Sequence, residues 1–352
     1  MAIFSINNTR IAGIAACVPK NEVSNMDYDF TTEKERKLYV KTTGIEKRRV
    51  AQKGLTTSDL CFEAAEKLIS ELDWNKEDIE LLVFISQSGD FILPATATIL
   101  QDRLGLPKTC MAYDVGLGCS GFVYGLSQVS SLVQTGAAKK ALLLVGDIST
   151  ATASYRDKST FPLFGDAATA TAIEYKEESS PIHFNLMSDG SGYDAIIIPD
   201  GGLRNFINED SFKEKKYGEG IYRTGIQVAL DGIKVFTFSQ KEVVPNIRAL
   251  VETTLEKSLE EMDYFVLHQA NLLMNNSIRR KMKLEKEKFP LSIDRFGNTS
   301  SASIPLTIVT ELREELQSKE ANMLLCGFGV GLSWGSVQWK ADKIVIPELI
   351  EI

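Results

Sequence analysis

The pattern of hydrophobic and polar residues along the chain predicts alternating strands and helices. Residues 79–86 and 140–147 are almost continuously apolar, which is typical of strands that are buried on both faces of a sheet. Residues 57–72 and 95–104 have apolar residues at helical spacing, and residues 9–18 form an earlier apolar strand. Because strands and helices alternate, we expect an α/β fold with a mostly parallel sheet that helices cover on both faces.

The second half of the chain repeats this pattern. Three pairs of corresponding residues are separated by 180 to 182 positions: Gln87 and Gln269, Asp114 and Asp294, and Gly146 and Gly327. A period this long indicates two copies of one domain rather than a solenoid. We therefore predict an N-terminal half, residues 1–178, and a C-terminal half, residues 179–352, whose equivalent turns face one cleft. The second pair also predicts a strand and turn around residues 291–300.

One turn in the N-terminal half carries a candidate nucleophile. A strand at residues 111–115 leads into Gly116 and Gly118, then Cys119, and then a helix over about residues 122–133. Unpaired N–H groups at a helix N-terminus favour an anion and lower the pKa of a thiol, so we expect a reactive thiolate. A lone cysteine is more often an inert residue of the core, so residues elsewhere in the chain have to show whether Cys119 is catalytic or structural.

The same turn also fits a second function. Residues 116–121 match G-x-G-x-x-G, the dinucleotide-binding fingerprint. The acidic partner for the ribose should lie about 20 residues further on, but residues 134–140 contain no acidic residue and Asp147 comes late. A nucleotide-binding oxidoreductase is therefore an alternative, although this glycine pattern has no counterpart in the second half.

The repeat places two polar residues opposite the Cys119 turn. His268 corresponds to Ser86, and Asn298 corresponds to Gly118. Alone, a histidine at a strand end is as often structural as catalytic, and such an asparagine is usually a turn or cap residue. Because ligands bind at the carboxyl ends of parallel strands, we expect Cys119, His268 and Asn298 to converge from the two halves.

Composition narrows the class of protein. The chain has 352 residues, 44% of them hydrophobic, and its net charge of −8 argues against bulk nucleic-acid binding. The five cysteines are dispersed without a C-x-x-C pair, which suits a reducing compartment and neither a disulfide framework nor a zinc site. No stretch approaches the roughly 18 apolar residues of a membrane span. We therefore expect a cytosolic protein.

Several motifs resemble those of the β-ketoacyl-acyl carrier protein synthase III family of thiolase-fold condensing enzymes. They span nearly the whole chain in the family's order, at residues 43–45, 118–122, 164–168, 231–236, 268–271, 297–305 and 327–335. The resemblance implies a thiolase-like α/β fold, with two duplicated αβα halves packed as five layers αβαβα. It also implies a homodimer that uses acyl-coenzyme A or acyl-carrier thioesters as substrates, with no metal or redox cofactor.

The resemblance implies a role for each candidate residue. Cys119 would accept the acyl group from a thioester, which splits one difficult transfer into two easier ones. Its backbone N–H and that of Val330 would form an oxyanion hole, bordered by Phe328 and Gly329.

His268 and Asn298 would donate to the thioester oxygen of a malonyl-type group. The enolate left by loss of CO2 would then attack the acyl group on Cys119 to give a 3-oxoacyl product. An acyltransferase that passes the acyl group to an alcohol or amine is the alternative within this fold. Such a transfer has no enolate to stabilise, so the presence of Asn298 favours condensation.

This chain departs from the family at positions that contact coenzyme A. Stacking, phosphate-binding and neighbouring polar residues are replaced by Leu38, Thr42, Lys158, Ile233 and Leu273. The loss of stacking and phosphate pairing should weaken coenzyme A binding. We therefore expect the acyl group to arrive on a carrier protein, or on an unusual coenzyme A ester, in a specialised pathway rather than in housekeeping fatty-acid initiation.

Residues outside the catalytic set are expected to bind the substrates and the carrier. Residues 277–283 form a basic stretch in an otherwise acidic protein, so Arg280 and Lys281 are candidates for docking an acidic acyl carrier protein. A solvated helix face is the alternative. The resemblance also places Phe236 near the substrate, and Leu93 near a pocket that the dimer mate completes.

Overall fold

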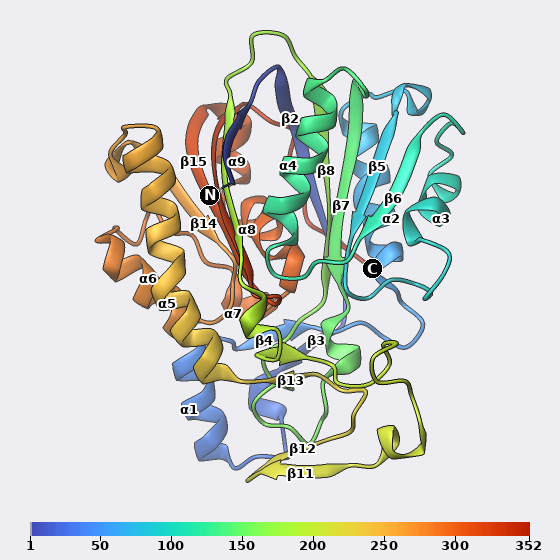
Figure 1. Cartoon of the computed structure of the whole chain (residues 1–352), viewed down its shortest axis with the longest axis vertical. Helices are drawn as coiled ribbons and strands as arrows, with labels where there is room; N and C mark the ends of the chain where they lie inside the picture. The colour runs from blue at the N-terminus through green and yellow to red at the C-terminus, as the bar shows by residue number, and fades with distance from the viewer. Residues whose placement is uncertain (1) are drawn as a thin grey trace.

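The computed structural model describes residues 2–352, which form two mixed β-sheets with helices between and outside them (Figure 1). The first sheet has six strands, in the order β17 (Ile350–Glu351), β2 (Thr9–Val18), β8 (Ala167–Tyr175), β7 (Lys140–Asp147), β5 (Leu81–Ile85) and β6 (Met111–Val115). The second has five, in the order β1 (Ala2–Ile6), β9 (Ile182–Ser188), β16 (Ser333–Asp342), β15 (Glu320–Gly329) and β14 (Tyr264–Leu267).

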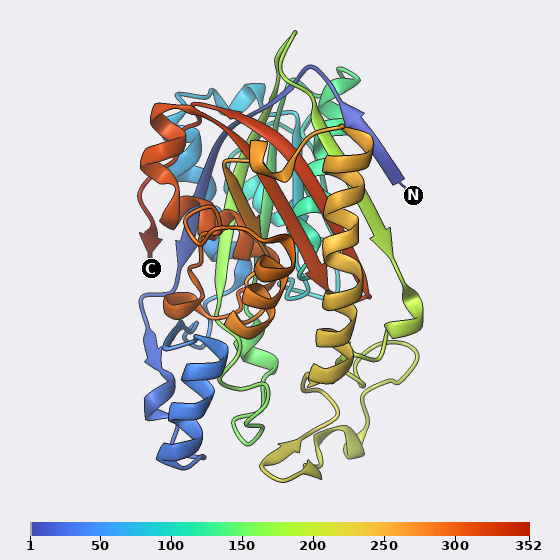
Figure 2. The same cartoon turned by 90° about the vertical axis from the view of Figure 1, so that its left-hand side faces the viewer.

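The helices and sheets stack as five layers. Helices α2 (Thr57–Glu71) and α3 (Thr96–Arg103) cover the outer face of the first sheet. Helices α4 (Gly121–Gln134) and α8 (Ser303–Glu311) pack against strands of both sheets and form the central layer. Figure 2 shows α5 (Gly232–Arg248) in front of the second sheet, with α6 (Leu272–Met282) beside it. The predicted thiolase-like layer order αβαβα is confirmed.

Both sheets share one succession of strands. In β2–β8–β7–β5 and in β9–β16–β15–β14, the first two pairs are antiparallel and the third is parallel. This matches the repeat read from the sequence. The strands at the two ends of the chain cross between the halves, because β1 pairs with β9 and β17 pairs with β2. The division at residue 178 stays a prediction.

The sheets are less parallel than predicted. Three of the four strand pairs in the second sheet are antiparallel. The physical reason is clearest at β15 and β16, which only three residues connect. A parallel pair needs a crossover of a dozen residues or more, so a turn this short fixes the two strands as antiparallel.

The strand predicted near residues 291–300 is also wrong. The segment forms α7 (Ile293–Phe296), a single helical turn. Ile293 and Phe296 are buried while Asp294 and Arg295 between them are exposed, which is the spacing of a helix rather than the alternation of a strand. The second sheet therefore has no counterpart of β6.

Helix α9 (Arg313–Ser318) leads from α8 into β15, and the remaining strands and α1 lie together below the sheets in the view of Figure 1. They are β3 (Glu22–Ser24), α1 (Glu33–Thr43), β4 (Lys47–Arg49), β10 (Ile196–Ile197), β11 (Lys215–Gly218), β12 (Ile221–Arg223) and β13 (Ala229–Leu230). None of the helices in residues 2–352 is both long enough and apolar enough to cross a membrane.

A buried cation holds this lower region against the sheets. Arg48 on β4 is only 1% exposed. Its Nε donates to Asn25 Oδ1 at 2.9 Å, and its Nη1 donates to the carbonyls of Phe161 and Phe164, each at 2.9 Å. These bonds fix the segment that leads into β8, and Leu163 and Phe164 of this segment line the cavity that also holds Cys119.

Replacement of Arg48 by methionine should lower the free energy of unfolding by about 3 kcal/mol, because three buried acceptors lose a charged donor. Urea unfolding followed by circular dichroism measures this change. The matched control is Arg248→Met, which removes an exposed pair with Glu252 and should cost less than about 0.5 kcal/mol. Equal effects of the two substitutions would contradict the structural role of Arg48.

Candidate active site

One cavity of about 310 Å³ collects the candidate residues of both halves. Cys119, His268 and Asn298 all line it, as do the predicted border residues Phe328, Gly329 and Val330. The rest of its wall is largely apolar and includes Ile196, Ile197, Val228, Leu230, Val235 and Met274. A cavity with this lining can bury an acyl chain next to a thiol.

Glycines allow the chain to approach the thiol closely. Cys119 follows β6 and precedes α4, and only 8% of the residue is exposed. A Cβ on Gly329 would lie 2.8 Å from Cys119 Sγ, and a Cβ on Gly118 would lie 2.3 Å from Gln87 Oε1. Any larger residue at these two positions would collide with the site.

This packing also accounts, without a nucleotide, for Gly118 and Gly121 of the glycine pattern in residues 116–121. At Gly121 an added Cβ would lie 2.8 Å from Ile85 Cγ2, and Gly118 faces Gln87 as described. In a dinucleotide-binding turn the second glycine, which corresponds to Gly118, lets the backbone approach the pyrophosphate. Here the side chain of Gln87 occupies the space in front of Gly118, which argues against the oxidoreductase alternative.

Burial, rather than the N-terminus of the helix, determines the direction in which the pKa of the Cys119 thiol shifts. Burial raises the pKa of the thiol to about 11, and the nearby Asp147 carboxylate adds to the effect. Hydrogen bonds from the backbone N–H groups of Val330 and of Cys119 itself, and from the Ser300 side chain, act in the opposite direction and are weaker in sum. The predicted lowering of this pKa is therefore wrong, and the resting thiol is protonated at neutral pH.

His268 is a neutral ring in a buried place. It follows β14, and its Nδ1 lies 2.7 Å from the hydroxyl of Ser303 at the start of α8. Burial lowers the pKa of the ring to about 4, against a smaller opposing effect of the Ser300 backbone. The Ser303 hydroxyl accepts the backbone N–H of Gln269 at 3.3 Å, so its own proton can go to Nδ1. That tautomer carries its proton on Nε2.

Phe328 fixes the plane of this ring. The two ring centroids are 5.5 Å apart and their planes are almost perpendicular, an edge-to-face contact. Phe328 is buried at the end of β15 and therefore limits how far the imidazole of His268 can tilt.

Asn298 is held by its backbone and by one side of its amide. Its N–H donates to the Leu163 carbonyl, and its own carbonyl accepts the N–H of Gly165, both at 3.0 Å. Its Oδ1 accepts the backbone N–H of Ser300 at 2.9 Å. Nδ2 has no hydrogen-bond acceptor among residues 2–352, so it can donate to a ligand in the cavity.

The sequence did not single out one further residue of the wall as part of the site. Asp147 at the end of β7 is 2% exposed and lines the cavity. It accepts hydrogen bonds from the Gln87 N–H at 2.7 Å, the Ser86 hydroxyl at 3.1 Å and the Ser301 hydroxyl at 2.8 Å. Asp147 directly follows the repeat residue Gly146, and this position was the feature of the sequence that could have identified it as part of the site.

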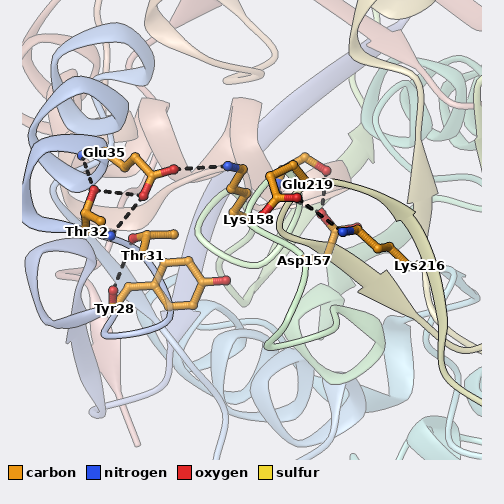
Figure 3. A network of polar contacts seen from close by, with 9 residues as sticks. Tyr28, Thr31, Thr32, Glu35, Asp157, Lys158, Lys216 and Glu219 are labelled. Carbon is orange, nitrogen blue, oxygen red and sulfur yellow. Dashed lines mark hydrogen bonds and ion pairs between the residues drawn. The ribbon is translucent and has the colours of Figure 1, made fainter.

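Other predicted substrate residues lie outside the cavity. Figure 3 shows Lys158 directed at Glu35, and its Nζ lies 3.0 Å from Glu35 Oε1. Lys158 lines a second cavity of about 410 Å³ beside α1. Phe236 and Leu273 each lie one residue from a lining residue, on α5 and α6, and do not line the cavity themselves.

Three more predicted contacts lie on the surface. Leu93 is 80% exposed in the loop between β5 and α3. Arg280 and Lys281 are exposed in the last turn of α6, where Lys281 Nζ donates to the Gln240 carbonyl at 2.8 Å. Any role for these residues depends on a partner rather than on the cavity.

Known proteins resemble this chain along nearly its whole length. Residues 113–190 match the family model 3-oxoacyl-[acyl-carrier-protein] synthase III, and residues 254–341 match the model of its C-terminal part. The chain is 32% identical to beta-ketoacyl-[acyl-carrier-protein] synthase III of Clostridioides difficile strain 630. The aligned region of 332 residues covers 94% of this chain and 98% of that protein.

Solved structures agree. The crystal structure of 3-oxoacyl-(acyl-carrier protein) synthase from Burkholderia xenovorans LB400 matches with a TM-score of 0.94 and 36% identity over 99% of both chains. That of 3-oxoacyl-(acyl carrier protein) synthase III from Pseudomonas aeruginosa PAO1 matches with a TM-score of 0.83 and 29% identity, over 96% of this chain and 100% of the other. The chain therefore belongs to the β-ketoacyl-acyl carrier protein synthase III family, condensing acyltransferases that yield 3-oxoacyl-acyl carrier protein.

Proposed function

We propose that Cys119 takes an acyl group from a thioester and gives it to the enolate of a malonyl-type thioester on acyl carrier protein. The observation that carries this proposal is one buried cavity that combines a thiol with two neutral hydrogen-bond donors, His268 and Asn298. Such donors are strongest where water is excluded and charge develops during the reaction.

In the acylation step, negative charge develops on the carbonyl oxygen of the incoming thioester. Backbone hydrogen bonding at Val330 and at Cys119 itself acts to lower the pKa of the thiol, so these two N–H groups can receive that oxygen once Sγ has bonded to the carbonyl carbon. Each donor in such a hole typically contributes about 3 kcal/mol to the transition state. Ser333 fixes the turn, because its hydroxyl donates to the Val330 carbonyl at 2.8 Å and accepts from the Ser120 hydroxyl at 2.6 Å.

In the condensation step, loss of CO2 leaves an enolate oxygen that needs two donors. A neutral His268 with its proton on Nε2 and the free Nδ2 of Asn298 can supply them. Because Ser300 holds Asn298 Oδ1, the amide presents its N–H groups rather than its oxygen. Acyl transfer to an alcohol or amine forms no enolate, so that reaction would not use the hydrogen bonds that the Asn298 amide can donate.

We propose that a carrier protein, rather than free coenzyme A, delivers the priming acyl group. Backbone hydrogen bonding at Thr32, and then Lys158, lower the pKa of Glu35 to about 2. Lys158 is therefore paired with a carboxylate that stays ionised. Arg36 donates to the carbonyls of Tyr28 and Thr31. These two cations are engaged with protein acceptors and offer little to a nucleotide phosphate.

Two protein partners fit the surface. We propose that Arg280 and Lys281 dock the acidic carrier protein. We also propose a homodimer, because the loop after β5 exposes Phe91, Ile92 and Leu93 at 66%, 100% and 80%, and such an apolar patch is normally covered. A cytosolic location is part of the same proposal.

Asn298→Asp should slow malonyl-thioester decarboxylation about 100-fold or more, because a donor becomes a carboxylate that repels the enolate. Release of labelled CO2 from malonyl-acyl carrier protein measures the decarboxylation rate. Intact-mass spectrometry should show that Cys119 of the variant is still acylated. Asn21→Asp, at an exposed position before β3, is the matched control and should keep the wild-type rate. A wild-type rate in Asn298→Asp would rule out the assigned role.

Acyl-carrier thioesters should load Cys119 at least about tenfold faster than the matching acyl-coenzyme A at equal concentration, since the missing phosphate contacts are worth more than about 1.4 kcal/mol. Intact-mass spectrometry over time reads the adduct, and Cys119→Ala should show none. Equal loading rates would refute the carrier preference without touching the condensation chemistry.

Charge reversal at Arg280 and Lys281 together, both to Glu, should raise KM for the carrier about tenfold and leave kcat unchanged, because opposite charge mainly promotes encounter. Steady-state rates at limiting carrier measure this effect, which should shrink in high salt. The control reverses Lys53 and Lys343, which are exposed elsewhere. Unchanged turnover at limiting carrier would place the docking site on another surface.

A further inference from the structure

A buried cation lies behind the wall of the cavity that carries Asn298. Arg48 is only 1% exposed, and no carboxylate of residues 2–352 forms an ion pair with it. Its guanidinium donates instead to neutral acceptors, which are the Asn25 amide and two backbone carbonyls. A buried charge without a counter-charge is costly to desolvate. Arg48 is therefore suited to holding backbone in place through its directed donors rather than to ion pairing.

Arg48 and Asn25 hold the carbonyls of one short segment, residues 161–164. This segment lies outside the named helices and strands, so its carbonyls need donors from elsewhere. Arg48 Nη1 donates to the first and the last of the four carbonyls, and Asn25 Nδ2 donates to the second, each at 2.9 Å. The remaining carbonyl, that of Leu163, accepts the backbone N–H of Asn298 at 3.0 Å. The acceptor on which Asn298 depends is thus fixed on both sides.

The stem of the Arg48 side chain also packs beside Asn298. Gly297, the preceding residue, has a φ of +67°. A Cβ on Gly297 would lie 3.0 Å from Arg48 Cγ and 3.0 Å from the Leu163 carbonyl oxygen. These groups are in close contact with no room for another atom, so a displacement of the Arg48 side chain or of Leu163 shifts the backbone of Asn298.

We propose that Arg48 is a positioning residue for Asn298, and that it fixes the point in the cavity at which Asn298 Nδ2 meets the enolate oxygen. This inference rests on the proposed function, which assigns that donor its role. Because the Ser300 N–H holds Asn298 Oδ1, the amide moves with the backbone rather than by rotation of its own. A misplacement of about 1 Å in a catalytic group can cost about 100-fold in rate.

The effect should be confined to one partial reaction. Cys119 lies in the turn between β6 and α4, and none of the acceptors of Arg48 belongs to that turn. The backbone N–H of Asp166 also donates to the Arg49 carbonyl at 2.8 Å, so β4 stays attached to the segment when the Arg48 side chain is shortened. Loss of the guanidinium should therefore displace Asn298 and leave the thiol in place.

Single-turnover acylation and malonyl decarboxylation test this separation. Arg48→Met should slow decarboxylation of malonyl-acyl carrier protein about 30-fold or more. Acylation of Cys119 by a short acyl-carrier thioester, read by intact mass, should stay within about threefold of wild type, since it does not use Asn298. Arg48→Lys keeps the charge but lacks the planar fork that reaches both carbonyls, so it should slow decarboxylation only about fivefold.

A double-mutant cycle distinguishes positioning from a general loss of stability. In Asn298→Ala the donor is absent, so addition of Arg48→Met should slow decarboxylation by less than about a further twofold. The matched control is Leu316→Ala on α9, which removes a fully buried side chain that does not line the cavity. It lowers stability through a core cavity and should leave both partial reactions at wild-type rates while the protein is folded.

A wild-type decarboxylation rate in Arg48→Met would overturn the inference. An equal loss of both partial reactions would do the same, because it indicates a structural role alone, and so would additive effects in the cycle. If circular dichroism shows that Arg48→Met does not fold, Arg48→Lys decides by the same comparisons. A wild-type decarboxylation rate in Asn298→Ala would instead refute the proposed function, since the donor that Arg48 positions would then take no part in the reaction.

Discussion

The site depends on the exclusion of water from the cavity that Cys119, His268 and Asn298 line, here called the seam between the two halves. This exclusion raises the pKa of Cys119 and of Asp147 and lowers that of His268. Thiol and imidazole are therefore uncharged before substrate arrives, and the hydrogen bonds inside the seam act in a medium of low polarity. In such a medium a neutral donor is worth more to a developing oxyanion than it would be in water.

The duplication explains how one seam came to hold different chemistry on its two sides. Gly146 and Gly327 are equivalent, and both permit close packing, because an added Cβ would meet Ala168 at 2.5 Å and Ser120 at 3.0 Å. The residues that follow them have diverged. Asp147 is a carboxylate that lines the same cavity as the thiol, whereas Phe328 makes an edge-to-face contact with the imidazole of His268. One backbone arrangement thus supports a carboxylate on one side of the cavity and an aromatic ring on the other.

The sequence predicted the elements that burial makes unambiguous. Strands β5 and β7 are apolar on both faces, and such short continuous apolar segments predict buried strands. The repeat then predicted that His268 lies opposite the thiol. The single turn of α7 was missed because four residues carry too little pattern. The pKa of Cys119 was misjudged because desolvation depends on the whole surrounding fold, whereas a helix end can be read from the local sequence. Asp147 belongs to the site through contacts with distant residues such as Ser86 and Ser301, which no local pattern records.

The exchanged end strands described above have a mechanical consequence. β1 is bonded to β9 over five residue pairs, and β17 is bonded to β2, so each end of the chain is fastened to the sheet of the opposite half. Two blocks joined in this way cannot swing apart like the lobes of a hinged enzyme. Passage of substrates and products therefore depends on the segments that border the cavity, such as those that carry Ile198 and Val228, rather than on separation of the two halves.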